Sequence, residues 1–147
     1  IELKDGTLMG FCRTNGGSQY VAFSKDGGQT FSELKPSNII SPVSPASIER
    51  IPSTGDLLLV WNNHEGIDAT LRGKRTPLSL AISRDEGKTW QQAQNIETNP
   101  NGWYCYTAME FTKDGVLLGH CAGDRTKNNG LAESQITFVP LSAIYGK

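Results

Sequence analysis

Long hydrophobic runs and dense clusters of one charge sign are both missing from this sequence. No apolar stretch approaches the roughly 18 residues that cross a bilayer. Fourteen lysines and arginines stand against 15 aspartates and glutamates, and the formal net charge is -1. A near-neutral chain without a basic stripe lacks the electrostatic footprint of a nucleic-acid-binding protein. We therefore expect neither a membrane nor a nucleic acid as a partner.

Cysteine is scarce, and its three positions form no CxxC pair. Cys12, Cys105 and Cys121 are odd in number and widely spaced, which indicates reduced, mostly buried thiols and no disulfide framework. His64 and His120 are isolated, with no third ligand at a spacing typical of zinc. We expect no metal and no cofactor. A chain of 147 residues can bury a core without such crosslinks.

A sustained helical period is also missing. Sixteen glycines and seven prolines interrupt the chain too often for a helical bundle, and they separate short apolar runs of β type. These runs predict strands over residues 7–12, 18–24, 46–51, 56–62, 78–83, 106–112, 116–122 and 134–141, with further strands opening at Phe31 and Trp90. The sequence therefore predicts an all-β fold with almost no helix.

The predicted strands repeat as one unit at a period of about 50 residues, which is typical of a β-propeller with four strands per blade. We place the blades at approximately residues 1–40, 41–100 and 101–147 of the chain. The first unit lacks most of its first strand, and the third lacks its fourth. Three blades do not close a ring that needs four to eight. We therefore expect a missing N-terminal half, or a second copy in a homodimer, to complete the ring.

Two segments share a turn motif of the form Ser-x-Asp-x-Gly-x-Thr-aromatic. Residues 24–31 read SKDGGQTF, and residues 83–90 read SRDEGKTW. The Ser hydroxyl and Asp carboxylate can bond backbone groups inside a tight turn, Gly accepts a positive φ, and the aromatic residue anchors the next strand in the core. We interpret Asp26 and Asp85 as structural. Each turn has too few carboxylates for calcium, which takes six to eight oxygen ligands.

The motif resembles the Asp-box of the sialidase (neuraminidase) superfamily, and the resemblance covers essentially the whole chain. It implies a sialidase-like six-bladed β-propeller, of which this chain supplies about three four-stranded blades. It also implies a secreted or periplasmic parent, although no secretory signal opens this chain and the compartment stays open. Members of the family resemble retaining glycosidases with a tyrosine nucleophile, a glutamate that takes the phenolic proton, and arginines that hold the substrate carboxylate.

The resemblance extends to individual positions. Tyr106 begins the predicted inner strand of the third blade, where the family carries the nucleophile. Glu2 lies three residues before the first Asp-Gly turn, where the family carries the glutamate base. Arg75 lies eight residues before the second Asp-box, where the family carries its last carboxylate-binding arginine. The strand before the first Asp-box contains no arginine, and Arg13, slightly upstream, is the candidate substitute.

Two neighbours of Tyr106 leave alternatives open. Tyr104 lies two residues away, so regular alternation along a strand predicts the same face and makes it a competing phenol. Trp103 is either a platform on which a sugar stacks or a lid on the core. The residues alone do not separate these two readings.

The resemblance implies a sialidase-like retaining exo-glycosidase that hydrolyses terminal acidic sugars, α-sialosides, and so binds carbohydrate. We expect the chain to be inactive alone, because the first arginine of the triad and the catalytic acid belong to the other half of such a propeller. Two alternatives remain open. One is a glycosidase of the same fold with another sugar specificity, and the other is a non-catalytic carbohydrate-binding or interaction propeller.

Overall fold

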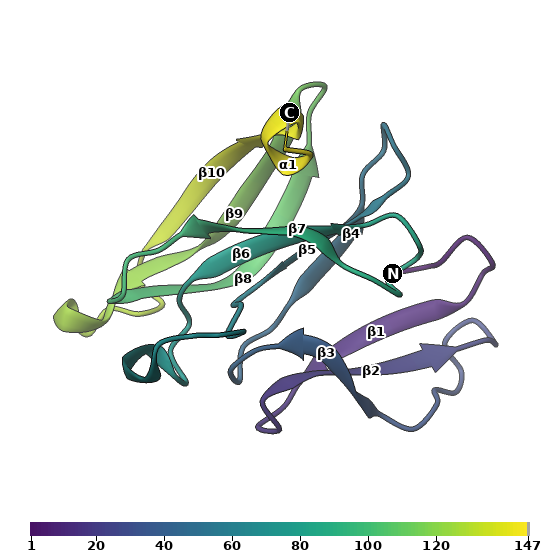
Figure 1. Cartoon of the computed structure of the whole chain (residues 1–147), viewed down its shortest axis with the longest axis horizontal. Helices are drawn as coiled ribbons and strands as arrows, with labels where there is room; N and C mark the ends of the chain where they lie inside the picture. Colours follow the sequence, from purple (N-terminus) through teal and green to yellow (C-terminus); the bar gives the residue numbers. More distant parts are fainter. Residues whose placement is uncertain (147) are drawn as a thin grey trace.

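The computed structural model describes residues 1–146, whose strands form three antiparallel sheets that fan out side by side (Figure 1). The first sheet contains β1 (Leu8–Arg13), β2 (Ser18–Ser24) and β3 (Lys35–Ile40). The second contains β4 (Ser47–Arg50), β5 (Leu57–Trp61), β6 (Leu78–Ser83) and β7 (Gln91–Glu97). The third contains β8 (Gly102–Phe111), β9 (Gly115–Asp124) and β10 (Ser134–Pro140).

Helical structure in residues 1–146 is confined to three short pieces. These are the 3-10 turns η1 (Ala69–Leu71) and η2 (Arg125–Lys127) and the single-turn helix α1 (Leu141–Ile144). None of the helices described is long and apolar enough to cross a membrane. The all-β prediction is confirmed, with one four-stranded sheet between two sheets of three strands.

The starts of β3 and β8 differ from the sequence prediction by more than one residue. β3 and β7 begin at Lys35 and Gln91 and not at the aromatic residue of each Asp-box. After the first Asp-box the chain first runs beside β2, where the Ser32 N–H donates to the Phe23 carbonyl at 2.8 Å. Phe31 is exposed, so its predicted role as a core anchor was wrong, whereas Trp90 packs on the core. β8 begins at Gly102, earlier than predicted.

The inner strands of the second sheet, β5 and β6, are buried on both faces, and this arrangement creates the two cores of the molecule. All five side chains of β5 are buried. Leu58 and Val60 face the third sheet in a core that includes Leu118. Leu59 and Trp61 alternate to the opposite face and pack with Ile39 and other residues of the first sheet. The outer sheets are therefore held in place by apolar contacts with a common central sheet.

Both Asp-boxes form the same hydrogen-bonded turn. In the first, the Ser24 hydroxyl accepts from the Gly28 N–H at 2.9 Å and donates to Asp26 at 2.8 Å. The Thr30 N–H and hydroxyl donate to the same carboxylate at 3.0 and 2.6 Å. The second turn repeats these bonds with Ser83, Asp85, Gly87 and Thr89 at 2.8 to 2.9 Å, and at 2.6 Å for the Thr89 hydroxyl. Each Asp thus organises its turn, as expected.

The donors in these turns, the threonine hydroxyl first, lower the pKa of Asp26 and of Asp85 to about 2. The unfolded chain then binds more protons than the folded chain between the ordinary pKa of 3.8 and a pKa of about 2. The stability contributed by each carboxylate is therefore complete above the ordinary pKa and is lost as the pH falls through about 2. Below that pH both states are protonated, and this contribution is absent.

Asp85→Asn is expected to lower the melting temperature at neutral pH and to reduce the further loss of stability between pH 4 and pH 2. The amide can replace an acceptor but not the charge that the turn stabilises. Thermal unfolding followed by circular dichroism at several pH values measures both effects. Asp114→Asn is the matched control, because the Asp114 carboxylate accepts no hydrogen bond from residues 1–146. Equal pH profiles for the two variants would contradict this account.

Candidate functional site

Tyr106 lies in a β-bulge that turns its side chain toward solvent. The pairing of β8 with β9 shifts register between Cys105 and Ala108, and Tyr106 has a φ of 56°. This left-handed conformation is uncommon for a bulky residue and is found where function or tertiary contacts require it. The Ser47 hydroxyl fixes the bulge from β4 by donating to the Thr107 carbonyl at 2.6 Å.

The bulge also separates the two candidate phenols. Tyr104 is 6% exposed and packs edge to face against His120, whereas Tyr106 is 50% exposed. The expectation that both side chains share one face was therefore wrong, because alternation holds only along a regular pleat. Tyr106 is the accessible phenol of this strand.

Two arginines from other parts of the fold reach Tyr106. Arg13, at the end of β1, donates from Nη1 to the Tyr106 hydroxyl at 3.3 Å across 93 positions of sequence. Arg75, in the loop between β5 and β6, places its guanidinium carbon 5.3 Å from the centre of the Tyr106 ring. The structure thus brings together three of the four proposed catalytic and carboxylate-binding residues, and each comes from a different sheet or its adjoining loop.

Arg75 is held by several contacts with β8 and its surroundings. Its carbonyl accepts from the Tyr104 N–H at 2.9 Å. Its guanidinium contacts Cys105 Sγ at 3.0 Å through Nη1 and the Val43 carbonyl at 3.4 Å through Nη2. It also lies 5.6 Å from the Trp103 ring. These contacts fix the position of the charge and leave it without an acidic partner in the described part of the chain.

Arg125, at the start of η2, is a further cation that sequence reasoning missed. Its guanidinium lies 4.3 Å from the Trp103 ring. Trp103 therefore contacts both Arg75 and Arg125, whereas Tyr106 contacts Arg75. The indole N–H of Trp103 and Nε of Arg125 are buried without a hydrogen-bond partner among residues 1–146. Arg125 occupies a polar loop with no periodic pattern, so only the fold could reveal its position.

The charge of this arginine cluster, defined as Arg13, Arg75 and Arg125, is not neutralised within residues 1–146. The ion pairs there involve Lys4, Arg50, Arg84 and His120. Interaction with Arg75, and then with Arg13, lowers the pKa of the Tyr106 hydroxyl. Burial, and then the charge of Arg75, lowers the pKa of Arg125. Concentrated positive charge with free guanidinium groups is suited to binding a carboxylate or another anion.

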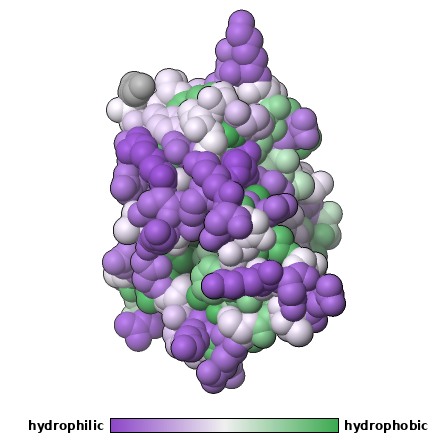
Figure 2. Space-filling view, turned by 90° about the vertical axis from the view of Figure 1, so that its right-hand side faces the viewer, coloured by the Kyte–Doolittle hydropathy of each residue, from purple (hydrophilic) through white to green (hydrophobic). Residues whose placement is uncertain are grey.

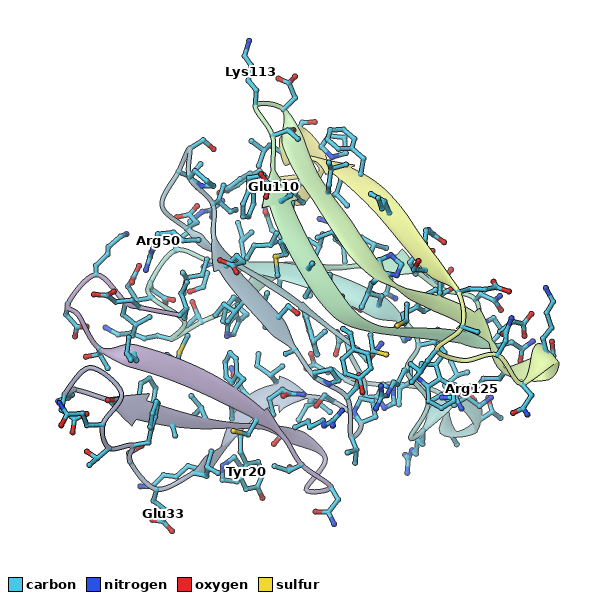
Figure 3. The ribbon with its side chains drawn as sticks, turned by 180° about the vertical axis from the view of Figure 1, so that it is seen from behind. Tyr20, Glu33, Arg50, Glu110, Lys113 and Arg125 are labelled. Carbon is cyan, nitrogen blue, oxygen red and sulfur yellow. The ribbon has the colours of Figure 1, made fainter. Side chains whose placement is uncertain are left out.

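The structure does not bring Glu2 to this cluster. Glu2 pairs with Leu8 at the opposite end of β1 from Arg13, and five residues of strand span about 17 Å. The Glu2 carbonyl accepts from Arg50 at 2.9 Å, and Figure 3 shows Arg50 and Arg125 on opposite sides of the molecule. The prediction that Glu2 is the base for Tyr106 therefore has no support in the geometry.

The end of the molecule that carries Glu2 has a different chemistry from the arginine cluster. Arg50 forms two hydrogen bonds of 2.9 Å with Glu86 in the second Asp-box. Lys4 N–H donates to the same carboxylate at 2.8 Å. The corresponding side of the surface is mainly hydrophilic, with scattered apolar patches (Figure 2). This rim is neutralised by its own ion pairs and is suited to a structural role.

The two histidines are engaged by the protein. His64 Nε2 lies 3.0 Å from the Lys74 carbonyl, and burial lowers the pKa of its imidazole. His120 contacts the Cys121 carbonyl at 2.9 Å and the Thr137 hydroxyl at 3.1 Å. In the described part of the chain, no group of three His, Cys, Asp or Glu residues is arranged to hold a metal.

A pocket of about 460 Å³ adjoins Tyr106 on the third sheet. Its other lining residues include His120 and Cys121 of β9 and Gln135 and Ile136 of β10. This volume is within the range of small-molecule sites. The pocket adjoins the accessible phenol, but Arg13, Arg75 and Arg125 are not among its lining residues.

Three antiparallel sheets side by side, two of them carrying Asp-box turns, have the architecture of blades of a sialidase-like β-propeller. A family model described as a BNR repeat-like domain matches residues 1–118. The chain belongs to this BNR repeat-like family. A search of curated proteins gives no match.

Solved structures share this fold across nearly the whole chain. The leech intramolecular trans-sialidase in complex with 2,7-anhydro-Neu5Ac is 20% identical, with a TM-score of 0.74 over 99% of this chain and 23% of its own. The NanB sialidase of Streptococcus pneumoniae is 21% identical, with a TM-score of 0.72 over 97% of this chain and 23% of its own. An α-L-arabinofuranosidase of Fusarium graminearum is 19% identical, with a TM-score of 0.60 over 94% and 42%. The predicted sialidase-like propeller fold is confirmed.

Replacing Arg75 is expected to raise the pKa of Tyr106, because Arg75 is the main group that lowers it. The Arg75→Met variant tests this by carbon NMR titration of ring-labelled tyrosine, with the Tyr106 signal assigned from Tyr106→Phe. Arg72→Met is the matched control, since Arg72 is an exposed arginine of the same loop. Identical Tyr106 titration curves in both variants would show that Arg75 does not act on the phenol.

Proposed function

We propose that this chain supplies the nucleophile and part of the carboxylate clamp of a retaining exo-glycosidase that acts on terminal acidic sugars, with α-sialosides as the substrate class. The observation that supports this most directly is the unpaired arginine cluster around an accessible tyrosine. In this role Arg13 and Arg75 hold the substrate carboxylate, and Tyr106 attacks the anomeric carbon. Arg125, which contacts the same Trp103 ring as Arg75, adds a further positive charge near the site.

The chemistry explains why a tyrosine suits an anionic substrate. A carboxylate nucleophile would be repelled by the carboxylate of the sugar, whereas a neutral phenol is not. The Tyr106 hydroxyl forms a bond to the anomeric carbon as the leaving-group oxygen departs, and water later releases the sugar with retained configuration. The neighbouring guanidinium groups lower the pKa of Tyr106, so they make it easier for a base to take the phenolic proton as the oxygen attacks.

The phenol still needs a base, because its ordinary pKa is near 10. A base acts when it lies within hydrogen-bond reach of the proton that it removes. Glu2 lies at the opposite end of β1 from the Tyr106 contact. We therefore propose that the assembled propeller presents another proton acceptor to the Tyr106 hydroxyl, and we keep Glu2 as a variant to test.

The chain spans about a quarter of the length of the sialidases that it matches. The activity is accordingly proposed for a propeller that contains this chain, completed either by further blades of a longer protein or by a second copy. The chain alone is expected to bind an acidic sugar without turning it over.

The second candidate is a glycosidase of the same fold that acts on a different sugar. It is favoured by the matches to a Fusarium graminearum α-L-arabinofuranosidase and to a Penicillium chrysogenum α-L-arabinanase complexed with arabinobiose. A neutral arabinoside, however, has no carboxylate that would require the arginine cluster. This difference in charge makes the two candidates separable by experiment.

Binding of N-acetylneuraminic acid to the chain is expected to be stronger than binding of its methyl ester. Hydrogen bonds to charged groups contribute about 1.5–3 kcal/mol, so loss of the carboxylate charge or of Arg75 weakens binding by about 10- to 100-fold. Isothermal titration calorimetry with wild type, Arg75→Met and the control Arg72→Met measures this. Equal affinity for acid and ester would remove the basis of the acidic-sugar proposal.

In a propeller that contains this chain, Tyr106→Phe is expected to abolish hydrolysis of a fluorogenic sialoside while retaining binding, because only the nucleophile is lost. Glu2→Gln is expected to keep turnover near the wild-type rate. Loss of turnover in Glu2→Gln with normal binding would instead make Glu2 the base. Hydrolysis of an arabinoside and not of the sialoside would select the second candidate. Sugar binding without turnover of either substrate would indicate a non-catalytic propeller.

A further inference from the structure

Cys105 and Cys121 lie directly opposite each other on the neighbouring strands β8 and β9. Residues opposite each other in an antiparallel pair place their side chains on the same face, with Cα atoms about 4.5–5.5 Å apart. Disulfides join cysteines whose Cα atoms are about 4.4–6.8 Å apart. Both thiols are free. A bond between them requires no change in the register of the sheet.

The two thiols differ in accessibility, and both adjoin the candidate site. Cys105 is 1% exposed and contacts the Arg75 guanidinium at 3.0 Å. Cys121 is partly exposed and lines the pocket beside Tyr106. Burial raises the pKa of the Cys105 thiol, Arg75 opposes the shift, and Cys121 adds to it. The pair therefore contains an accessible sulfur that can react first and a buried sulfur, next to a cation, that can react second.

We propose that Cys105 and Cys121 form a reversible disulfide, a modification site that controls the position of Arg75 and thereby the anion affinity of the arginine cluster. The effect on sugar binding rests on the function proposed above, whereas formation of the bond and its effect on Arg75 do not.

The reaction is a thiol–disulfide exchange with a low-molecular-weight disulfide such as oxidised glutathione. The Cys121 thiolate attacks one sulfur of this reagent, the bond between its two sulfurs breaks, and one glutathione leaves and takes up a proton. The Cys105 thiolate then attacks the Cys121 sulfur and displaces the second glutathione. Two cysteines are oxidised with the loss of two hydrogen atoms, and one external disulfide is reduced to two thiols. A reducing dithiol reverses the sequence.

Bond formation changes what Arg75 can contact. A bridged Cys105 sulfur is drawn toward Cys121 and can no longer become a thiolate partner of the guanidinium. The Val43 carbonyl and the Trp103 and Tyr106 rings remain as neighbours. Oxidation removes one hydrogen bond that positions Arg75, the contact with Cys105. A single hydrogen bond contributes modestly to stability, so we expect oxidation to weaken anion binding by about two- to tenfold.

The first test is chemical and uses the full 147-residue chain. After equilibration with mixtures of reduced and oxidised glutathione, intact mass and thiol counting of the Cys12→Ser variant are expected to show loss of two hydrogen atoms and no remaining thiol, whereas the exposed Cys12 of the wild type can in addition carry one glutathione. Peptide mapping without reduction then identifies the Cys105–Cys121 link. Cys12→Ser is the matched control and should form the same bridge, whereas Cys121→Ser should not. Stable mixed disulfides without a bridge, or a bridge that includes Cys12, would overturn the proposal.

The second test follows the Tyr106 carbon NMR titration in the reduced and oxidised protein. The titration is expected to shift on oxidation in wild type and Cys12→Ser and to stay constant in Cys121→Ser, with circular dichroism confirming that each variant is folded. A bridge that leaves the Tyr106 titration unchanged would refute control of Arg75. If the bridge forms and the titration shifts, but N-acetylneuraminic acid binds in neither state, the proposed function fails while the disulfide switch stands.

Discussion

The two inner strands of the second sheet must be covered on both faces, and the rest of the molecule depends on this constraint. β5 and β6 are buried throughout, so their alternating side chains need an apolar partner on each side. The first and third sheets supply these partners through separate cores. Packing both sheets on one central layer is what allows Arg13 of β1 to reach Tyr106 of β8. The site is therefore a product of sheet packing and not of local sequence.

The arginines at the two ends of the molecule differ in charge balance because they have different partners. Arg50 is held by the Glu86 carboxylate, and its hydrogen bonds are the main cause that lowers the pKa of Glu86 to about 2. Arg75 and Arg125 lie instead against aromatic rings, and Arg75 also contacts the uncharged Cys105 thiol and the Val43 carbonyl. A ring stabilises a cation without cancelling its charge. One end thus has an internally neutralised structural network, while the other has fixed cations that can still interact with an external anion.

Local rules predicted the features that short segments determine by themselves. Alternation of apolar residues identified the strands, and the Ser, Asp, Gly and Thr positions predicted both turns, because their hydrogen bonds lie within a few residues. The resemblance also led to Arg13, Arg75 and Tyr106, which the structure brings together. Regular alternation failed for the face of Tyr104, since the bulge at Tyr106 depends on a distant contact from Ser47. The resemblance placed Glu2 beside Tyr106, whereas the structure pairs Glu2 with Leu8 at the other end of β1. Arg125 was missed because only the packing of η2 brings it to Trp103.

β10, the outer strand of the third sheet, leaves one edge of that sheet open to pairing with another strand. Within residues 1–146 the free edge of β10 pairs with no other strand, and its Ile136 and Phe138 side chains are 72% and 48% exposed. An unpaired edge with exposed apolar side chains is a template on which another strand can add its backbone hydrogen bonds. We therefore expect self-association through this edge to increase with concentration, and we expect a strand that pairs with β10 to suppress it.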